Sequence, residues 1–246
     1  MCDEPKNSYN AILAHAQACY PLEACGVIIV EDGKERFIPC VNLDEKPLEA
    51  FTMDEMILEE HDGNIQAIVH SHCDRPAKPS EADLVGCEET DLPWLIISIP
   101  SGETEFIKPS GYEAPLIGRK YAFGIFDCYT LIRDYYSQVH GIKLPEYTKE
   151  LMNRWREGEE VYLEAFADAG FKEIRFQDLR KGDAILFSFP PPRWARHGKR
   201  PLNHAAIYFG KQTILHHTEN RLSSRDLLDG YHLQHAKLYL RHKDLT

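Results

Sequence analysis

Residues 65–83 read IQAIVHSHCDRPAKPSEAD, an apolar strand pattern that ends in two histidines and leads through prolines to an acidic segment. Side chains two residues apart in a strand point to the same side, so His70 and His72 project from one face. Asp83 follows eleven residues after His72. Two imidazoles and a carboxylate match the protein ligands of a catalytic zinc site, with a fourth position open for water. This stretch therefore predicts a metal site at the end of a strand.

The same residues also have a purely structural interpretation. An isolated His-x-His in a strand more often fills a core or a surface than binds a metal. The segment Ser80-Glu81-Ala82-Asp83 is typical of a helix start, with Ser80 as the cap and acids in the first turn. The two interpretations are compatible, because a capped helix start is a rigid place to hold a ligand.

The residues around this stretch alternate between helical and extended patterns, which is typical of an α/β domain. Ser8 is the expected N-cap of the first helix, and Gly63 is the expected end of the second. The predicted elements are helices over 8–19 and 53–62 and strands over 25–30, 65–72 and 92–100.

Together with Glu23 in PLEACG, the HSH triplet and the following PSEAD resemble the JAMM (Mov34/MPN-type) metalloprotease family over residues 8–108. The resemblance implies a mixed sheet with flanking helices and a zinc ion bound by His70, His72 and Asp83. It further implies that Glu23 is the general base toward water at the zinc and that Ser80 steadies the oxyanion. Without the motif, Glu23 would be a surface acid. Cys25 fits a small core residue. Cys73 stands where bacterial members often carry proline.

The charge balance changes along the chain. The net charge is −11, but 22 of the 39 acids and only 7 of the 28 basic residues precede residue 113. Residues 109–118, PSGYEAPLIG, collect Pro, Gly and Ser at this point and are typical of a linker. We therefore expect a zinc metalloprotease-like domain over 1–110 and a second domain over 115–246.

Composition narrows the class of protein. A hydrophobic content of 43% supports a sizeable core. No apolar run approaches the ~18 residues that span a bilayer, and the first ten residues are not typical of a secretory signal. Seven scattered cysteines without a CxxC pair predict neither a disulfide framework nor a zinc ribbon, which favours a reducing, intracellular site of synthesis. The absence of a dense basic stripe argues against nucleic acid as a partner.

The second half begins with a helical pattern over 128–140 that starts at Cys128 and ends at Gly141, and strands are predicted over 183–189, 204–210 and 213–218. A helix followed by antiparallel strands is an α+β arrangement. A helix start stabilises a thiolate, so Cys128 is a candidate nucleophile whose pKa should lie below ~8.5. A lone buried cysteine is otherwise inert. The Pro-rich basic segment 189–201 is expected to be a loop, either beside the cleft or simply on the surface.

The order Asp-Cys on a helix, Gly182-Asp183 opening a strand and His204 opening the next resembles the NlpC-type papain-like cysteine peptidases over residues 115–240. The resemblance implies that Cys128 is the nucleophile, that His204 is its base and that His216 orients the imidazole. It also implies peptidoglycan stem peptides as substrates. The chain has Tyr129-Thr130 where the family usually has Ser-Gly after the cysteine.

Two further positions accompany this second motif. His217 competes with His216 for the orienting role, and only one of them can serve, because neighbours in a strand face opposite ways. The family spacing favours His216. Tyr121 in YAFG matches a tyrosine that lines the substrate site in the family, although its interval to Cys128 is short.

The two domains in this order resemble the tail tip assembly proteins of lambda-like siphophages. That resemblance implies a protein made in the bacterial host cytoplasm that joins other tail tip proteins and hydrolyses peptidoglycan peptides during DNA entry. Three hypotheses follow: a bifunctional hydrolase, a zinc domain that processes a tail protein or host conjugate beside a wall-cleaving cysteine domain, and an assembly factor whose sites serve structure.

Overall fold

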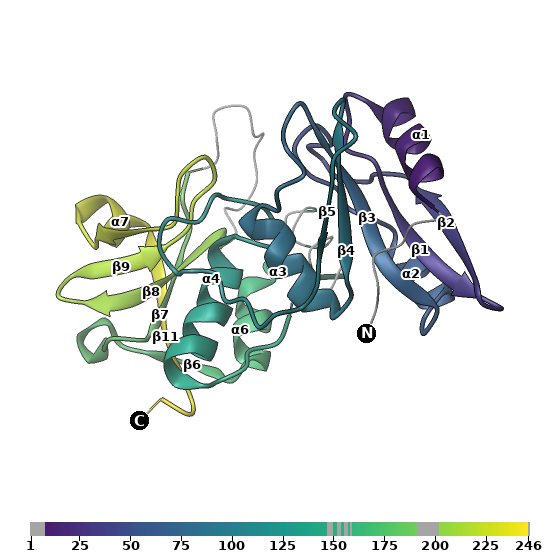
Figure 1. The fold of residues 1–246 in the computed structure, drawn as a ribbon. Helices are drawn as coiled ribbons and strands as arrows, with labels where there is room; N and C mark the ends of the chain where they lie inside the picture. Colours follow the sequence, from purple (N-terminus) through teal and green to yellow (C-terminus); the bar gives the residue numbers. More distant parts are fainter. Residues whose placement is uncertain are drawn as a thin grey trace. The chain divides into compact units, whose positions relative to one another are not determined.

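The computed structural model describes residues 8–146, 150–151, 154, 157, 159–190 and 202–245. The chain divides into two compact units, residues 1–114 and 115–246, and each contains its own sheet (Figure 1). Positions 191–201 of the Pro-rich basic segment lie outside the described residues. Among the helices that the structure describes, none has the length and apolar character needed to cross a membrane.

Over residues 8–114, the first unit is a five-stranded sheet in the order β2-β1-β3-β4-β5 with three helices. Strands β3 and β4 are parallel, and the other neighbours are antiparallel. This is the mixed sheet with flanking helices that the sequence predicted. The elements are α1 (Tyr9–Cys19), β1 (Cys25–Glu31), β2 (Lys34–Cys40), α2 (Glu55–Glu60), β3 (Ile65–Cys73), α3 (Glu81–Thr90), β4 (Trp94–Ile99) and β5 (Thr104–Ile107).

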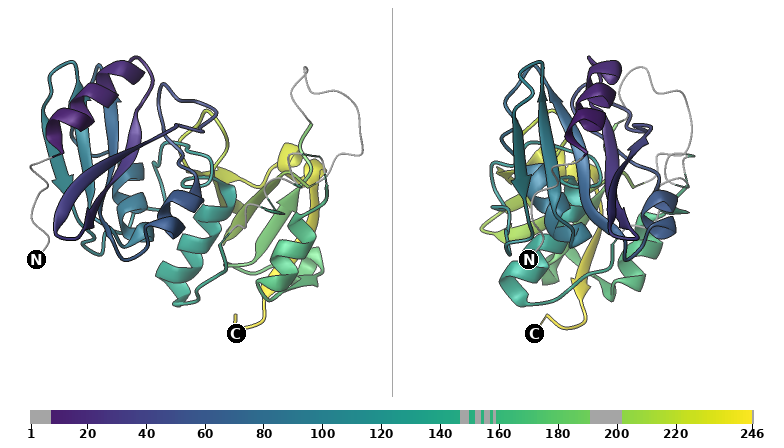
Figure 2. Two further views of the ribbon diagram at one scale, coloured as in Figure 1. Left: turned by 90° about the vertical axis from the view of Figure 1, so that its right-hand side faces the viewer. Right: turned by 45° about the vertical axis from the view of Figure 1, so that its right-hand side comes forward.

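Alternation along the central strands gives this sheet two apolar faces. One face packs against α1 through a cluster that includes Ile12, Ile28 and Val69, and Figure 2 shows α1 lying along the sheet. The opposite cluster contains Ile68 and Trp94 together with residues of α2 and α3. The histidines of β3 share the parity of Ile68, so they face the α2 and α3 side.

The second unit is a six-stranded antiparallel sheet in the order β10-β9-β8-β7-β11-β6, which confirms the α+β class. Its helices and turns are α4 (Cys128–Tyr135), η1 (Tyr136–His140), α6 (Tyr162–Asp168), η2 (Phe176–Asp178) and α7 (Gly230–His235). Its strands are β6 (Phe171–Ile174), β7 (Ala184–Phe187), β8 (His204–Gly210), β9 (Thr213–His216), β10 (Ser224–Leu227) and β11 (Ala236–His242).

Helix α4 packs on β8 and lies in the larger apolar cluster of this unit. Leu131, Ile132 and Tyr135 are buried, as the predicted helical face requires. The helix widens into the π-helical turn η1 and ends where Gly141 takes the left-handed conformation at φ 66°, which costs glycine no steric penalty. The packing of α4 on β8 brings the helix start to the strand that begins at His204.

Candidate functional site

His70, His72 and Asp83 form a compact buried group at the end of β3 and the start of α3. His70 Nε2 lies 3.2 Å from Asp83 Oδ1, His72 Nε2 lies 3.3 Å from Asp83 Oδ2, and the two Nε2 atoms are 3.2 Å apart. Both histidines are 1% exposed. A tetrahedral zinc ion with bonds of about 2.1 Å needs ligand atoms about 3.4 Å apart. The three side chains therefore have the spacing of a zinc ligand set.

Neighbouring groups fix the orientation of these side chains. The imidazole Nδ1 of His72 lies 2.8 Å from the Pro76 carbonyl oxygen, which can only accept a proton, so Nε2 keeps its lone pair on the side of Asp83. The Asp83 carboxylate accepts a hydrogen bond from the Ser80 backbone N–H at 2.6 Å. Burial raises the pKa of the Asp83 carboxyl, but the close imidazoles of His70 and His72 outweigh burial and hold the pKa well below its usual range. Asp83 is therefore a fixed carboxylate.

Ser80 and Asp83 join in a reciprocal capping box, in which the Ser80 hydroxyl accepts from the Asp83 backbone N–H at 3.2 Å. The capping box confirms the helix-cap interpretation of this segment, and the candidate ligand Asp83 is one of its two residues. The hydroxyl hydrogen of Ser80 is not used by the cap. Cys73, at the end of β3, instead directs its thiol at the Leu22 carbonyl oxygen.

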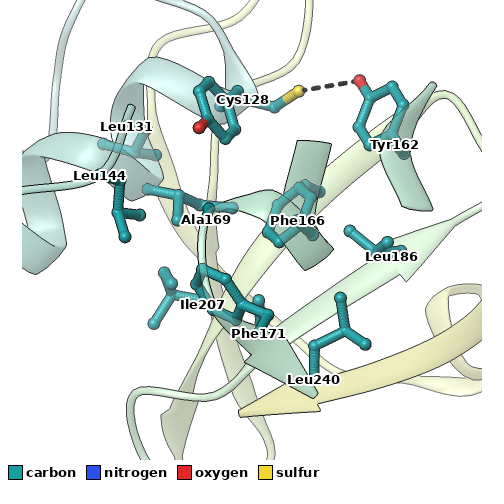
Figure 3. Close-up of a cluster of buried hydrophobic side chains, with 14 of the residues drawn as sticks. Cys128, Leu131, Leu144, Tyr162, Phe166, Ala169, Phe171, Leu186, Ile207 and Leu240 are labelled. Carbon is teal, nitrogen blue, oxygen red and sulfur yellow. Dashed lines mark hydrogen bonds between the residues drawn. The ribbon is translucent and has the colours of Figure 1, made fainter. Parts of the chain in front are cut away.

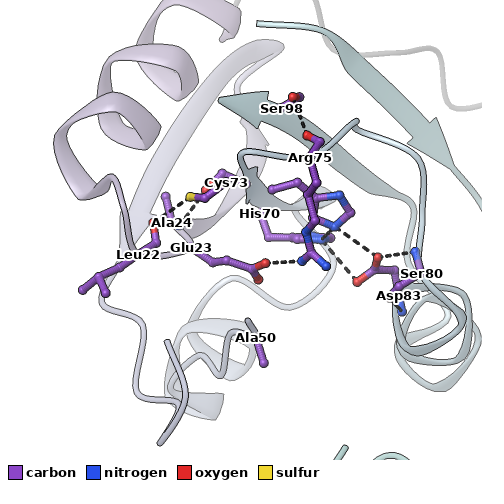
Figure 4. A network of polar contacts seen from close by, with 12 residues as sticks. Leu22, Glu23, Ala24, Ala50, His70, Cys73, Arg75, Ser80, Asp83 and Ser98 are labelled. Carbon is purple, nitrogen blue, oxygen red and sulfur yellow. Dashed lines mark hydrogen bonds and ion pairs between the residues drawn. The ribbon is translucent and has the colours of Figure 1, made fainter. Parts of the chain in front are cut away.

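Glu23 lies just before β1 and is 2% exposed. Its carboxylate forms an ion pair with the guanidinium of Arg75, as Figure 4 shows. Burial raises the pKa of the Glu23 carboxyl, and His70, Arg75 and His72 oppose that rise. A buried carboxylate with a raised pKa is suited to accept a proton near neutral pH. Sequence reasoning missed Arg75, because nothing in its spacing indicates a partner 52 positions earlier in the chain.

Cys128 opens α4, and Asp127 caps this helix by accepting from the backbone N–H groups of Tyr129 and Thr130. The cysteine is 9% exposed, and its sulfur lies 3.5 Å from the hydroxyl oxygen of Tyr162, as Figure 3 shows. Tyr162 begins α6, a helix that the sequence did not predict. The thiol therefore lies at the junction of two helices and β8.

The expectation of a lowered thiol pKa at Cys128 is wrong for this structure. Burial raises the pKa of Cys128 to about 12, and the neighbouring carboxylate of Asp127 adds to the rise. Hydrogen bonds from Tyr162 and from the backbone at Ala205 oppose it only in part. The helix start favours a thiolate, but removal of the sulfur from water is the larger effect. The resting side chain is a neutral thiol.

His204, His216 and Asp226 form a line of hydrogen bonds behind this cysteine. His204 Nε2 lies 3.1 Å from His216 Nδ1, and His216 Nε2 lies 3.1 Å from Asp226 Oδ2. Burial lowers the pKa of the His204 imidazole well below its usual value, and the nearby histidines add to that effect. His204 is therefore a neutral base whose Nε2 is engaged with His216.

Asp226 was missed by sequence reasoning. It lies on β10, which pairs with β9 so that Ser224 stands opposite His216. Asp226 is two residues farther along and shares that face of the sheet. The segment SRDL lacks the apolar alternation that predicts a strand. Because β10 was not predicted, nothing in the sequence placed Asp226 beside His216.

The side chains of His217 and Tyr121 contact each other and are not part of this line of hydrogen bonds. Their rings make a T-shaped contact with centroids 5.2 Å apart. Burial lowers the pKa of His217 to about 4. The structure thus brings His216, and not His217, next to His204.

Cys128 and His204 both line a pocket of about 490 Å³ within the second unit, and Tyr121, Tyr162, Phe189 and His217 also contribute to its wall. Its volume falls in the range of small-ligand sites, about 300–1,000 Å³. An apolar wall with a few polar groups suits a short peptide. The pocket therefore places the thiol, the imidazole and Tyr121 around one space.

Comparison with known proteins assigns the two halves to families. Residues 5–108 match the prokaryotic homologues of the JAB domain, and residues 118–241 match the NlpC/P60 family. The chain is 32% identical over 99 residues to the CysO-cysteine peptidase of Mycobacterium tuberculosis, covering 36% of this chain and 67% of that protein. The JAB-like and NlpC/P60 domains together indicate peptidase or hydrolase activity.

Two relatives match both halves together. The chain is 35% identical over 245 residues to the tail tip assembly protein K of Escherichia phage N15, covering 98% of this chain and 96% of the relative. It is 33% identical over 173 residues to the protein of the same name in Escherichia phage lambda, covering 70% and 79%. The chain belongs to the phage tail tip assembly protein K family, with a JAB-like domain followed by an NlpC/P60 domain.

Proposed function

We propose that the chain is a bifunctional peptidase of the phage tail tip, in which the second domain cleaves peptidoglycan stem peptides and the first hydrolyses an isopeptide-like bond. The observation that carries the proposal is the common pocket of Cys128 and His204, backed by the hydrogen bonds from His204 to His216 and from His216 to Asp226. The protein acts at the tail tip after synthesis in the host cytoplasm, with other tail tip proteins as partners.

The tautomers follow from the hydrogen-bond line. An ionised Asp226 can only accept, so His216 carries its proton on Nε2 and offers the lone pair of Nδ1. His204 then donates from Nε2 to His216, which leaves the lone pair of its Nδ1 for a proton from Cys128. The arrangement gives His204 the one tautomer in which it can act as base.

The cysteine reaction starts from a neutral thiol and a neutral imidazole. His204 removes the thiol proton as the sulfur attacks the peptide carbonyl carbon, and the sulfur–carbon bond forms. The protonated His204 then donates its proton to the departing amine as the peptide bond breaks. Water, deprotonated by the same imidazole, releases the acid product and restores the thiol. Because Cys128 contacts the Tyr162 hydroxyl at rest, the thiol must turn toward His204 in the first step.

Peptidoglycan stem peptides are the proposed substrate of this pocket, on the strength of the NlpC/P60 match. Purified peptidoglycan incubated with the full chain should release stem-peptide fragments that mass analysis identifies. Cys128→Ala should release none, whereas Cys19→Ala, a half-buried cysteine outside this domain, should behave like the parent. Equal release by Cys128→Ala would refute the proposal for this domain.

The first domain has the donor set for zinc, since its two imidazole nitrogens and one carboxylate have tetrahedral spacing. A zinc ion held by His70, His72 and Asp83 would supply Lewis acidity toward water and toward a carbonyl oxygen. Glu23 is the proposed proton acceptor for that water, and it would pass the proton on to the departing amine. The Ser80 hydroxyl is the proposed donor to the developing oxyanion. The ion pair with Arg75 opposes the rise in the pKa of the Glu23 carboxyl that burial causes.

The substrate proposed for this domain is the C-terminal peptide or isopeptide bond of a tail protein or a host conjugate. The similarity to a relative named CysO-cysteine peptidase supports a peptide-type bond as the target. Purified tail proteins should lose a C-terminal segment when incubated with the zinc-loaded full chain but not with Glu23→Gln. Processing that survives in Glu23→Gln would exclude this assignment.

Assembly without catalysis is a second candidate, because the two relatives that match both halves are named for tail tip assembly. Complementation of a phage that lacks the protein distinguishes the two. Under the peptidase proposal, Cys128→Ala yields complete tails that fail to deliver DNA through the wall. Under the assembly alternative, Cys128→Ala particles infect normally.

A further inference from the structure

A second set of potential metal ligands lies in the second unit. His216, Asp226 and His232 each offer one ligand atom, and these atoms all lie within 4.8 Å of one another. Across the described residues, this group and the His70 group are the two that bring such atoms together. It stands on β9, β10 and α7, so it is separate from the JAB-like site.

His232 is oriented as metal-bound histidines are. Its Nδ1 lies 2.9 Å from Asp229 Oδ1, and the same carboxylate oxygen accepts from the His232 backbone N–H at 3.1 Å. A carboxylate that accepts from Nδ1 fixes the tautomer and leaves the lone pair on Nε2, an arrangement that recurs at histidines that bind metals. The His232 ring makes a T-shaped contact with the His216 ring, with centroids 5.5 Å apart. Nothing in the proposed peptidase reaction uses His232.

The other two ligands are also held in place. His216 is fixed by His204 at Nδ1, so Nε2 is the nitrogen on the side of Asp226. The Ser224 hydroxyl donates to Asp226 Oδ1 at 3.1 Å. Arg221 Nη1 lies 3.1 Å from Asp226 Oδ2 and is the cation that a metal would displace. The Arg221 side chain is 58% exposed, so it can turn into solvent at little cost.

We propose that His216, Asp226 and His232 bind Zn²⁺ and that this binding switches off the cysteine site by reversing the tautomers of His216 and His204. This inference deepens the proposed function of Cys128 and rests on it. A metal on Nε2 of His216 leaves the proton of the neutral ring on Nδ1. That N–H donates to His204 Nε2, which must then carry a lone pair. His204 consequently bears its proton on Nδ1 and cannot take one from the thiol.

The consequence is that the cysteine site is inactive while zinc is bound and becomes active once zinc is removed. The wrong tautomer of a catalytic histidine is costly, about 10⁴-fold in the serine proteases where it has been produced. The geometry thus links a metal site on the outer strands to the base of the cysteine reaction through one hydrogen bond of 3.1 Å.

Zinc titration calorimetry on the full chain tests the site itself. In a His70→Ala, His72→Ala background, which removes the ligands of the first domain, we expect one Zn²⁺ bound per chain. Adding His232→Ala should abolish this binding. Adding His235→Ala, on the same helix but outside the ligand group, should not. Failure of the background to bind zinc, or undiminished binding in His232→Ala, would overturn the site. Binding that is lost in Cys128→Ala would instead identify the thiol as the ligand.

Two rates in the same background test the switch. Saturating Zn²⁺ should slow stem-peptide cleavage by at least about 100-fold. When His232→Ala is added to the background, the same zinc should slow cleavage by no more than about twofold. Zinc that binds without slowing cleavage would refute the tautomer mechanism.

Nitrogen-15 spectra of labelled histidines separate this inference from the proposed function. They should show the His216 proton on Nε2 without zinc and on Nδ1 with it. If no form of the chain cleaves peptide, the proposed function fails, while calorimetry and the tautomer shift still decide the metal site.

Discussion

At the level of single residues, Cys128 is governed by burial more than by its place at a helix start. Its thiol is buried among Tyr162, the backbone of β8 and the first turn of α4, and its pKa is raised to about 12. The adjacent Asp127 carboxylate acts in the same direction. The proton must therefore leave during the reaction and not before it.

The raised pKa of Cys128 gives its alkylation a defined pH dependence. Below the pKa, the thiolate fraction grows about tenfold per pH unit, so we expect the rate of labelling by iodoacetamide to keep rising from pH 7 to pH 10. Peptide mapping after timed labelling measures this rate for each cysteine. A plateau at Cys128 that is reached below pH 8 would show a preformed thiolate and imidazolium pair instead.

Glu23 is the residue whose replacement separates metal binding from catalysis. Glu23→Gln keeps the size and removes the base, so hydrolysis by the first domain should fall by about 10²- to 10⁴-fold. Metal analysis of this variant in a His232→Ala background should still find one zinc per chain, because Glu23 is not a ligand. Loss of that zinc would mean that Glu23 binds the metal directly.

At the level of elements, the start of α4 depends on its cap. The Asp127 carboxylate accepts from the backbone N–H groups of Gly124, Tyr129 and Thr130. Asp127→Ala should lower the free energy of unfolding of the second unit by about 1–2 kcal/mol.

Urea unfolding measures the effect of the Asp127 change. Asp178→Ala, which removes an exposed ion pair with Arg175, serves as the matched control and should cost less than about 1 kcal/mol. Equal losses in the two variants would show that the cap contributes nothing specific.

Elements with strong periodicity could be predicted from the sequence, and weakly patterned ones could not. The helix after Ser8 and the β3 histidines follow from apolar spacing, and the helix that starts at Cys128 follows from apolar spacing and its cap. Ser8 itself makes no side-chain cap hydrogen bond. Strands β2 and β10 are half-exposed edges with the sequences KERFIPC and SRDL, so they lack the apolar alternation that marks a strand.

The same limit explains which site residues were found. His70, His72 and Asp83 are close in the chain, so strand alternation and a helix cap were enough to predict that they lie together. Tyr162 contacts Cys128 only through tertiary packing, and the same is true of Arg75 and Glu23. The raised pKa of Cys128 depends on burial by these distant segments and has no local signal.

At the level of the whole molecule, each apolar cluster takes all of its residues from a single unit. Each unit therefore has a core of its own. We expect residues 115–246 to fold alone and to give one cooperative unfolding transition without zinc. Calorimetry of that fragment and of the full chain measures this. A fragment that unfolds gradually, with no heat-absorption peak, would mean that the second unit needs the first.

The central claim is that Cys128 is the nucleophile of a peptidase, and the covalent intermediate tests it most directly. Purified stem peptides mixed with the full chain and quenched in acid within seconds should leave an acyl group on the tryptic peptide that contains Cys128, detected as a mass increase equal to the acyl fragment. The adduct should be absent in Cys128→Ala and strongly reduced in His204→Ala. Cleavage that proceeds with no adduct on Cys128, or that persists in Cys128→Ala, would contradict the account.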